Sequence, residues 1–368
     1  FASQGIHHPA LMAAIAERTL QTGFLDTFNA QDVAMTAWAF GTLGIAPEGL
    51  LERLKTRLLR DPALLDTFSP QAITMTVWAC AKLGRADPEF LRVVADKVTE
   101  TGFLEEFKPE HLANTAWAFA TLGKRETALM EAVAERALDP EVLAAFTHHE
   151  LANLVWAFAE LGIRDEALME GLAEKILSDA DYLLFSPQSM ATTAWAFAKL
   201  GFRSEPLMRA IAGVVSARDK RHTMTPEHVA MIAVAYASLG IHNGEVMAFL
   251  ESQGKGEAFA AQLDAEAAVG TLAAFATLRV SNEELVANIA KHMLADEFLS
   301  TFSPRQAATA VEAWAKLGVR NDALVAKLLR HLEEDGRVLA VEADERVFLK
   351  KTFLELGISQ DALGADWQ

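Results

Sequence analysis

Polar side chains recur at two positions of a repeated sequence unit, six and three residues before a tryptophan that marks the unit. A spacing of three residues places both positions on one face of a helix. Their donors and acceptors match the edges of nucleobases, and in helical-repeat proteins one repeat can address one base. The alternative is an ordinary solvated first turn with variable polar residues. The base-reading candidates are Asp32, Met35, His111, Asn114, Glu150, Asn153, Ser189, Thr192, His228, Gln306 and Thr309.

A basic column follows the glycine that closes each unit. Its arginines are spaced by 39 residues or by a multiple of 39, and His242 fills one intermediate place. Cations aligned along one edge of stacked helices could follow a phosphate backbone. The alternative is that each arginine forms an exposed ion pair with a neighbour such as Glu126, Asp165 or Glu205. The phosphate-binding candidates are Lys124, Arg125, Arg164, Arg203 and Arg320.

Signals for catalysis are weak. The sequence has no phosphate-binding glycine loop and no HExxH motif, and adjacent histidines such as His148 and His149 point apart in most backbones. Cys80 occupies an aromatic position and is interpreted as a small buried hydrophobe. Glu312 intrudes into the tryptophan column, which indicates an irregular unit rather than a general base. We therefore expect no enzyme, no metal site, no cofactor and no small-molecule substrate.

The unit behind these patterns is about 39 residues long. Words such as AWAFATLG (116–123) and AWAFAKLG (194–201) recur, and their tryptophans follow at spacings of 40, 39, 39 and 39 residues. Leucines in the same register continue the ladder after the tryptophan is lost. Repetition at a fixed period of this length is typical of solenoid proteins. The tryptophans are Trp38, Trp78, Trp117, Trp156 and Trp195.

Each unit is expected to form two helices, because apolar residues recur at helical spacing and no stretch alternates with a period of two. Thr147 with Glu150 and Ser303 with Gln306 have the spacing of a capping box. A glycine ends most units and predicts a left-handed cap. Predicted N-caps followed by a proline are Ser69, Thr225 and Ser303.

These helices predict the all-α class, as an α-solenoid of about nine 39-residue helix-turn-helix repeats that form a superhelix. Residues 1–368 are expected to form a single array. Its regular repeats span about 6–201, its degenerate repeats about 202–357, and its tail 358–368.

Two aromatic columns are too regular for a ligand site and predict core packing. One is the tryptophan column, and the other lies two residues later in each unit. The second column consists of Phe40, Phe119, Phe158, Phe197, Tyr236, Phe275, Trp314 and Phe353, with Cys80 in the second unit.

The chain carries 33 Lys+Arg against 50 Asp+Glu, a net charge of −17. This balance excludes a uniformly basic nucleic-acid-binding surface, although an elongated array could still carry a basic edge. The single cysteine cannot form an internal disulfide. No apolar run reaches the roughly 18 residues of a membrane span.

The segments KPEHLANTAWAFATLG (108–123) and SPQSMATTAWAFAKLG (186–201) resemble the octotricopeptide repeat, a helical hairpin related to the tetratricopeptide and pentatricopeptide repeats. The resemblance covers nearly the whole chain and weakens after Met224. It implies an RNA-binding protein of mitochondria or chloroplasts, with its targeting peptide removed. The implied roles are RNA stability, processing, translation or ribosome assembly. Beyond Met224 the tryptophan is replaced by Val234, Ala273, Glu312 and Lys351.

Two functions therefore stand side by side. The first is an organellar RNA-binding solenoid whose partner is single-stranded RNA or rRNA. The second is a protein-binding or structural solenoid, a subunit or assembly factor of a large organellar complex such as the mitochondrial ribosome. The resemblance and the arginine column favour the first, while the charge of −17 and the degenerate units after Met224 favour the second.

Overall fold

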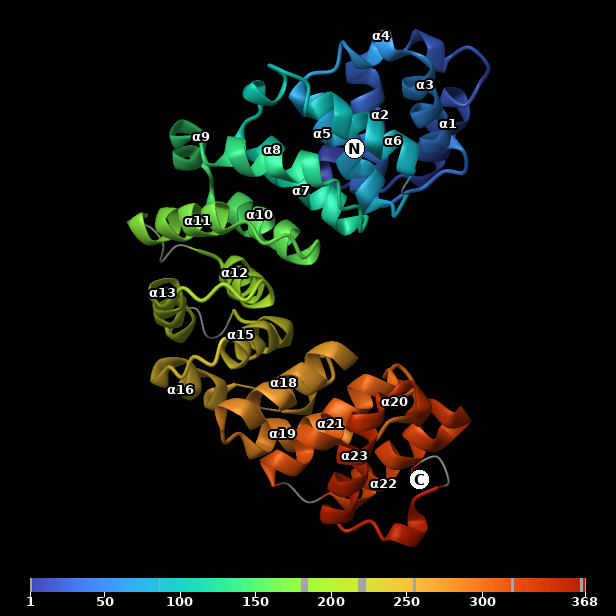
Figure 1. Cartoon of the computed structure of the whole chain (residues 1–368). Coiled ribbons are helices and arrows are strands. Elements are labelled where there is room, and N and C mark those ends of the chain that lie inside the picture. Colours follow the sequence, from blue (N-terminus) through green and yellow to red (C-terminus); the bar gives the residue numbers. More distant parts are fainter. Residues whose placement is uncertain are drawn as a thin grey trace. The chain divides into compact units, whose positions relative to one another are not determined.

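The computed structural model describes residues 2–85, 87–179, 185–217, 223–253, 256–318, 321–364 and 367, without the side chains at 335–337 and 344–345. Within these residues every regular element is a helix (Figure 1). The chain forms two compact units, residues 1–182 and 183–368. The expected all-α fold of packed helical hairpins is confirmed. The single array over the whole chain, with its superhelix, stays a prediction.

In the first unit, each repeat contains a first helix and a second helix. The first helices are α1 Pro9–Thr19, α3 Leu50–Arg60, α6 Pro88–Val98, α8 Thr127–Ala137 and α11 Glu166–Ser178. The second helices are α2 Ala30–Leu43, α5 Pro70–Lys82, α7 Pro109–Thr121 and α10 His148–Glu160. The second helices lie side by side in this order.

The second unit repeats the pattern. Its second helices are α12 Pro187–Lys199, α15 Pro226–Ser238, α18 Ala265–Leu278, α21 Pro304–Leu317 and α23 Ala343–Glu355. Its first helices are α13 Glu205–Ser216, α16 Gly244–Ser252, α19 Glu283–Met293 and α22 Asp322–Glu333. Again each second helix packs against the next second helix.

Short helices also lie between the first and second helix of several repeats, in addition to the two helices expected for each unit. Two of them, at 62–65 and 140–145, begin with a proline that follows an aspartate N-cap, which favours a new helical turn. The short helices are α4 Pro62–Leu65, α9 Pro140–Ala145, α17 Glu257–Ala260 and α20 Asp296–Leu299, with the 3₁₀ turns Leu25–Thr27 and Leu104–Glu106.

The predicted helix boundaries are confirmed at both ends of the second helices. Ser69, Thr225 and Ser303 are N-caps whose hydroxyl accepts from the backbone three residues later. The closing glycines adopt left-handed φ angles, for example 63° at Gly123. Arg279 fills the same place after α18 with φ 55°, a conformation that is costly for a residue with a Cβ.

The second aromatic column forms the core, as predicted. Phe119, Phe158 and Tyr236 are at most 1% exposed, and the other described members of the column are equally buried. Neighbouring second helices approach closely at small residues, since a Cβ added at Gly41 of α2 would lie 3.0 Å from Ala79 Cα of α5. Thr74 and Thr115 hydroxyls, 3.2 Å apart, join α5 to α7 inside this layer.

The prediction of core packing is wrong for the tryptophan column. Trp38, Trp78, Trp117, Trp156 and Trp195 are all half-buried. Two residues rotate a helix by about 200°, so side chains in the two aromatic columns point in nearly opposite directions. Only one of the two columns can face the core.

The tail after α23 packs back onto the last helices of the second unit. The indole ring of Trp367 is nearly buried and lies edge-on against Phe353, with ring centroids 5.4 Å apart. Its Nε1 donates to Glu333 Oε1 of α22 over 3.0 Å, and the Gly364 N–H donates to the same oxygen. In the tail predicted at 358–368, Gly364 and Trp367 therefore cover α22 and α23.

Candidate nucleic-acid interface

Each second helix leaves one narrow face open to solvent. In α7 this face consists of Glu110, Asn114, Trp117 and Thr121, which are exposed or half-buried, while Phe119 points into the core. Steps of four, three and four residues keep these positions on one side of a helix. We call this face the stripe, and number its positions −7, −3, 0 and +4 from the tryptophan.

Tryptophans at position 0 form a ladder across three neighbouring helices of the first unit. Ring centroids lie 6.4 Å apart for Trp78 and Trp117, and 6.5 Å apart for Trp117 and Trp156. The ring planes are tilted by 36° and 31°. Half-buried aromatic rings in a row are the kind of platform on which unpaired bases stack.

Lysines at position +4 lie against these rings. Lys82 Nζ is 5.7 Å from the ring centroids of both Trp78 and Trp117, and Lys199 Nζ is 4.5 Å from that of Trp195. A cation over an aromatic face is attracted by the ring quadrupole. The stripe therefore presents positive charge beside an aromatic ring at Lys82 and Lys199, whereas Glu160 takes position +4 on α10.

Candidates three residues before the tryptophan lie on the stripe. Asn153 Nδ2 is 3.1 Å from His149 Nε2, and the Thr309 hydroxyl donates to the Arg305 carbonyl over 2.9 Å. All five are exposed or half-buried and belong to different helices: Met35, Asn114, Asn153, Thr192 and Thr309.

Candidates six residues before the tryptophan occupy the third position of their helix, where they cap it. Glu150 Oε2 accepts from the Thr147 N–H over 2.8 Å, and Gln306 Oε1 accepts from Ser303 over the same distance. Asp32 Oδ2 accepts from Asn29 over 3.1 Å. Both predicted capping boxes are thus confirmed, with a further box at Asp32.

The two histidines of this column make the same contact through Nδ1. His111 accepts from the Lys108 N–H and His228 from the Thr225 N–H, both over 3.2 Å. Burial lowers the pKa of each imidazole below its ordinary value. The neutral ring keeps the lone pair that accepts this hydrogen bond.

Ser189 completes the column, with its hydroxyl 2.9 Å from that of the N-cap Ser186. His111 and Ser189 are buried, so the expected pairs do not share the open face of their helices. The neighbours of position −3 on the stripe are instead the exposed residues at −7. A template of polar positions spaced by four, three and four would have found them in the sequence. They are Gln31, Gln71, Glu110, His149, Gln188, Glu227, Glu266 and Arg305.

The described arginines of the basic column are exposed in the loops after the closing glycines, and Lys124 is half-buried beside Arg125. Arg164 pairs with Glu166 over 3.1 Å, and Arg203 with Glu205 over 2.8 Å. Asp165, one expected partner, caps α11 instead, through a 2.9 Å bond from the Leu168 N–H. Arg320 lies outside the described residues. The phosphate ladder stays a prediction, and these ion pairs support the alternative for two of its members.

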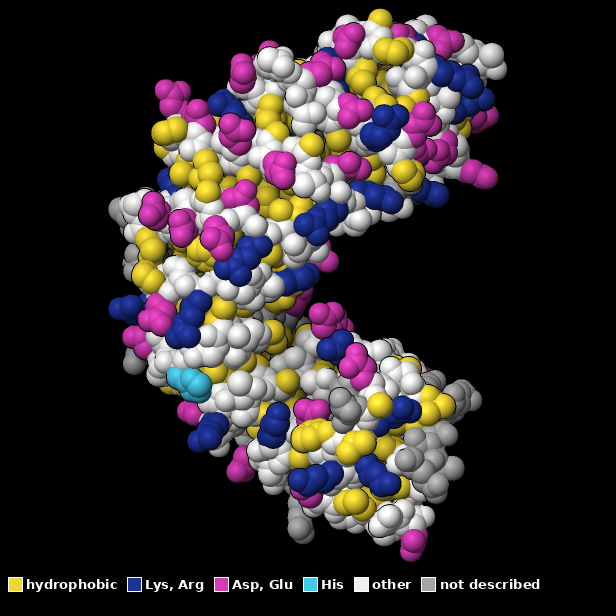
Figure 2. All heavy atoms as spheres, viewed as in Figure 1, with side chains coloured by type: hydrophobic (Ala, Val, Ile, Leu, Met, Phe, Trp, Pro, Cys, Tyr) yellow, Lys and Arg dark blue, Asp and Glu magenta, His cyan; other side chains and the backbone are white. Residues whose placement is uncertain are grey.

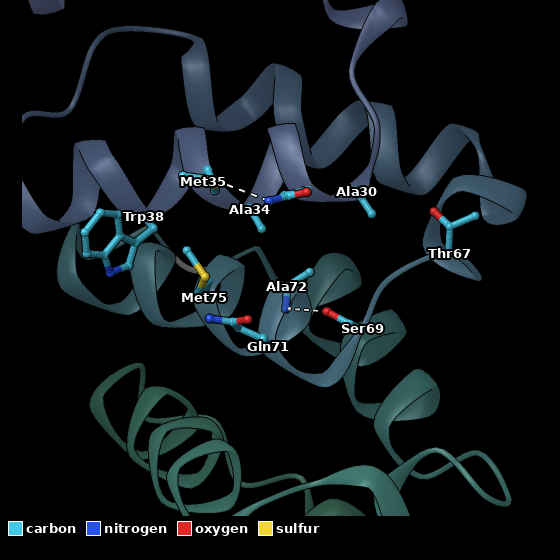
Figure 3. Close-up of a pocket in the computed structure, with 10 residues that line it drawn as sticks. Ala30, Ala34, Met35, Trp38, Thr67, Ser69, Gln71, Ala72 and Met75 are labelled. Carbon is cyan, nitrogen blue, oxygen red and sulfur yellow. Dashed lines mark hydrogen bonds between the residues drawn. The ribbon is translucent and has the colours of Figure 1, made fainter. Parts of the chain in front are cut away.

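A groove opens on the stripe between α2 and α5, with a volume of about 630 Å³. Figure 3 shows Met35 and Trp38 on one side, and Gln71 and Met75 on the other. The groove lies entirely within the first unit. Over the drawn face of each unit, basic and acidic side chains are interspersed (Figure 2).

Groups suited to other chemistry are few. Burial raises the pKa of the Cys80 thiol to about 12, which makes it a poor nucleophile. Among the described residues there is no cluster of three or more His, Cys, Asp or Glu side chains able to hold a metal ion. None of the described helices is both long enough and apolar enough to cross a membrane.

Stacked helical hairpins with a shared aromatic face define a helical-repeat protein of the α-solenoid class. A family model described as RNA-editing substrate-binding complex 6 protein matches residues 1–145 and 141–338, which together span most of the chain. The chain belongs to the RNA-editing substrate-binding complex 6 protein family. No curated protein matches it. The octotricopeptide repeat stays a resemblance.

Proposed function

We propose that this chain is a non-catalytic component of an RNA-editing substrate-binding complex and binds single-stranded RNA on the stripe of its first unit. The tryptophan ladder on α5, α7 and α10 carries this proposal. Every base has a flat face, so stacking on indole rings tolerates many sequences. Membership of the family supports RNA and other proteins of such a complex as the partners.

The stripe also supports a contribution from base edges. Asn114 and Asn153, each three residues before a ladder tryptophan, present carboxamides beside the rings. A carboxamide offers both donors and an acceptor. Residues at −6 serve as caps, so we assign them a structural role and the residues at −7 and −3 the contacts with bases. Lys82, beside two rings of the ladder, and Arg125 are the cations that we assign to phosphates.

We further propose mitochondrial rather than chloroplast localisation. The match to a family named for RNA editing supports the mitochondrial alternative and lends no support to the chloroplast one. Roles in ribosome assembly and translation, which the repeat resemblance implied, have no comparable support. RNA processing in the form of editing agrees best with the family description.

Replacing Trp117 by leucine tests this function. Its ring is in contact with both neighbouring rings of the ladder, and base–aromatic stacking contributes about 1–3 kcal/mol per base, so RNA affinity should fall roughly 5- to 150-fold. Binding of a fluorescent single-stranded RNA is measured by anisotropy at low salt. The matched control is Glu131→Gln, an exposed change on the first helix α8, which should bind like the unchanged chain.

Two results would contradict the proposal. One is equal affinity in the Trp117→Leu and unchanged chains, with both folded by circular dichroism. The other is no detectable RNA binding at low salt. The second result would favour the protein-binding solenoid, for which the structure offers exposed apolar side chains near the end of the second unit. Leu339 is 57% exposed, Val347 71% and Phe348 47%.

A further inference from the structure

The groove between α2 and α5 differs from the layers that follow it. Trp78, Trp117 and Trp156 contact one another across α5, α7 and α10, so the stripe is closed there by their rings. Among the described residues, no aromatic ring contacts Trp38. The residues of α5 that line the groove are Gln71, Ala72 and Met75, none of which is aromatic. Within the described residues of the first unit, the α2–α5 layer therefore has an open groove where the α5–α7 and α7–α10 layers have ring contacts.

The walls of the groove combine an aromatic face, two thioethers and two carboxamides. Trp38 and Met35 stand on α2, and Met75 on α5, over a floor of small side chains that includes Ala34 and Ala72 (Figure 3). Neither alanine extends past its Cβ, so both leave room in the groove.

Polar groups at the rim are available to a ligand. In the described part of the chain, no hydrogen bond is made by the Gln71 carboxamide. The Gln31 carboxamide has only a contact of 3.8 Å from Nε2 to Met35 Sδ. Both are exposed and occupy position −7 of adjacent helices. At the far end, the hydroxyl of Thr67 donates to the Leu64 carbonyl and keeps its acceptor capacity.

None of the side chains that line the groove is charged. An anionic phosphate would therefore find no cationic partner among these side chains, which favours a neutral ligand group. Every nucleobase meets this requirement, because it has flat apolar faces and an edge with adjacent donors and acceptors. A carboxamide is complementary to such an edge.

We infer that the α2–α5 groove binds one unpaired nucleobase of a single-stranded RNA. The base stacks against Trp38 between Met35 and Met75, and the carboxamides of Gln31 and Gln71 hydrogen bond to its edge. This inference rests on the proposed function, and it adds to it a defined subsite. The ladder holds bases on its surface, whereas the groove takes a single base inside.

The test couples a change in the protein to a change in the RNA. Binding of a twelve-nucleotide RNA, and of twelve versions that each carry one abasic position, is measured by anisotropy. An RNA of this length is roughly what a few repeats can cover. In the unchanged chain, one abasic position should weaken binding roughly 5-fold or more, as expected for loss of one stacked base.

The double variant Gln31→Ala/Gln71→Ala and the variant Trp38→Leu should each weaken binding of the intact RNA by a similar factor. In either variant, the abasic substitution at that position should have little further effect, because the base and its site have already been uncoupled. Gln360→Ala, which removes an exposed carboxamide outside the stripe, is the matched control and should preserve the full abasic effect.

The outcomes separate the two proposals. If the losses of RNA affinity in the groove variants add to the loss at every abasic position, the groove is not a base site. A loss of RNA affinity in Trp117→Leu would then still support RNA binding on the ladder. No RNA binding by the unchanged chain overturns both. If Met35→Glu leaves RNA affinity unchanged but prevents assembly with the protein subunits of the complex, the groove receives an apolar protein side chain and the inference fails.

Discussion

A histidine at the third position of a second helix can cap the helix only while its imidazole is neutral. Glutamate and glutamine at the same position accept the same hydrogen bond through a side-chain oxygen. His111 and His228 accept a backbone N–H through Nδ1, the contact that Gln306 makes in α21 through its amide oxygen. Protonation removes the acceptor and adds a charge in a partly buried place. The caps at α7 and α15 are therefore sensitive to acid.

This sensitivity has a definite sign. Because burial lowers the pKa of both imidazoles, the unfolded chain binds these protons more readily than the folded chain. Their contribution to stability is complete above the ordinary histidine pKa of about 6.5 and declines as the pH falls from there toward the folded-state pKa. Urea midpoints measured at about pH 7.5 and about pH 5.5 should therefore decrease on acidification.

The variant His111→Gln/His228→Gln provides the control, because glutamine caps α21 in the same way. Its urea midpoint should change less with pH over this interval than that of the unchanged chain. An equal pH dependence in the two proteins would show that other groups cause it. Glu110 and Lys108, which lie beside His111 and act on its pKa in opposite directions, are present in both.

At the scale of elements, the packing of one second helix on the next depends on small residues in register. Gly41 of α2 shows this directly, because an added Cβ would lie 3.0 Å from both Cα and Cβ of Ala79 on α5. Gly213 of α13 offers a contrast, since no atom lies within 4 Å of a Cβ built there. Both glycines are inside helices, so the same substitution separates packing from helix propensity.

Leucine at position 41 should destabilise the chain by about 1–3 kcal/mol, because overpacking forces α2 and α5 apart. Leucine at position 213 should leave the stability unchanged or raise it by up to about 1 kcal/mol, because leucine forms helices better than glycine. Chemical unfolding of Gly41→Leu and Gly213→Leu measures both. Equal losses of stability in the two variants would refute the close approach of α2 and α5.

For the molecule as a whole, acidic and basic side chains are interspersed over the drawn face of each unit (Figure 2). The net charge of −17 includes carboxylates that cap helices, such as Glu150, or pair with arginines, such as Glu166. We expect only a few phosphate contacts in the RNA complex. The logarithm of the RNA binding constant should therefore fall only modestly with the logarithm of the salt concentration, with a slope of about −0.7 per contact. Anisotropy titrations over a series of salt concentrations measure this slope.

The Lys82→Met variant should reduce the slope by roughly one contact, because Lys82 lies against the rings of the ladder. The variant Glu166→Gln tests the opposite change. It frees Arg164 from its ion pair and makes it available to a phosphate, so the salt dependence of RNA binding should become steeper. A steep dependence that neither variant alters would place the phosphate contacts elsewhere in the chain.

The periodicity of the sequence made the fold predictable. It made only part of the proposed RNA-binding face predictable. Caps, closing glycines and the buried column at Phe119 follow from residue type and spacing, because local backbone preferences and burial decide them. The direction of Trp117 does not follow from hydrophobicity, which ranks tryptophan with the core. Angular position on the helix decides it, and the same angle places Asn114 on the stripe and His111 at the cap. The short helix at 140–145 escaped prediction because its length carries no periodic signal.

The angle of about 200° between the two aromatic columns lets one sequence unit change along two independent lines. After Met224 the outward position becomes Val234, Ala273 and Glu312, while the inward position keeps the bulk of Tyr236, Phe275 and Trp314. Folding thus depends on the inward residues, and the proposed RNA contact depends on different residues of the same helix. On this proposal, a repeat could lose its RNA contact, or acquire another contact, while it stays folded, and neighbouring repeats could diverge one at a time.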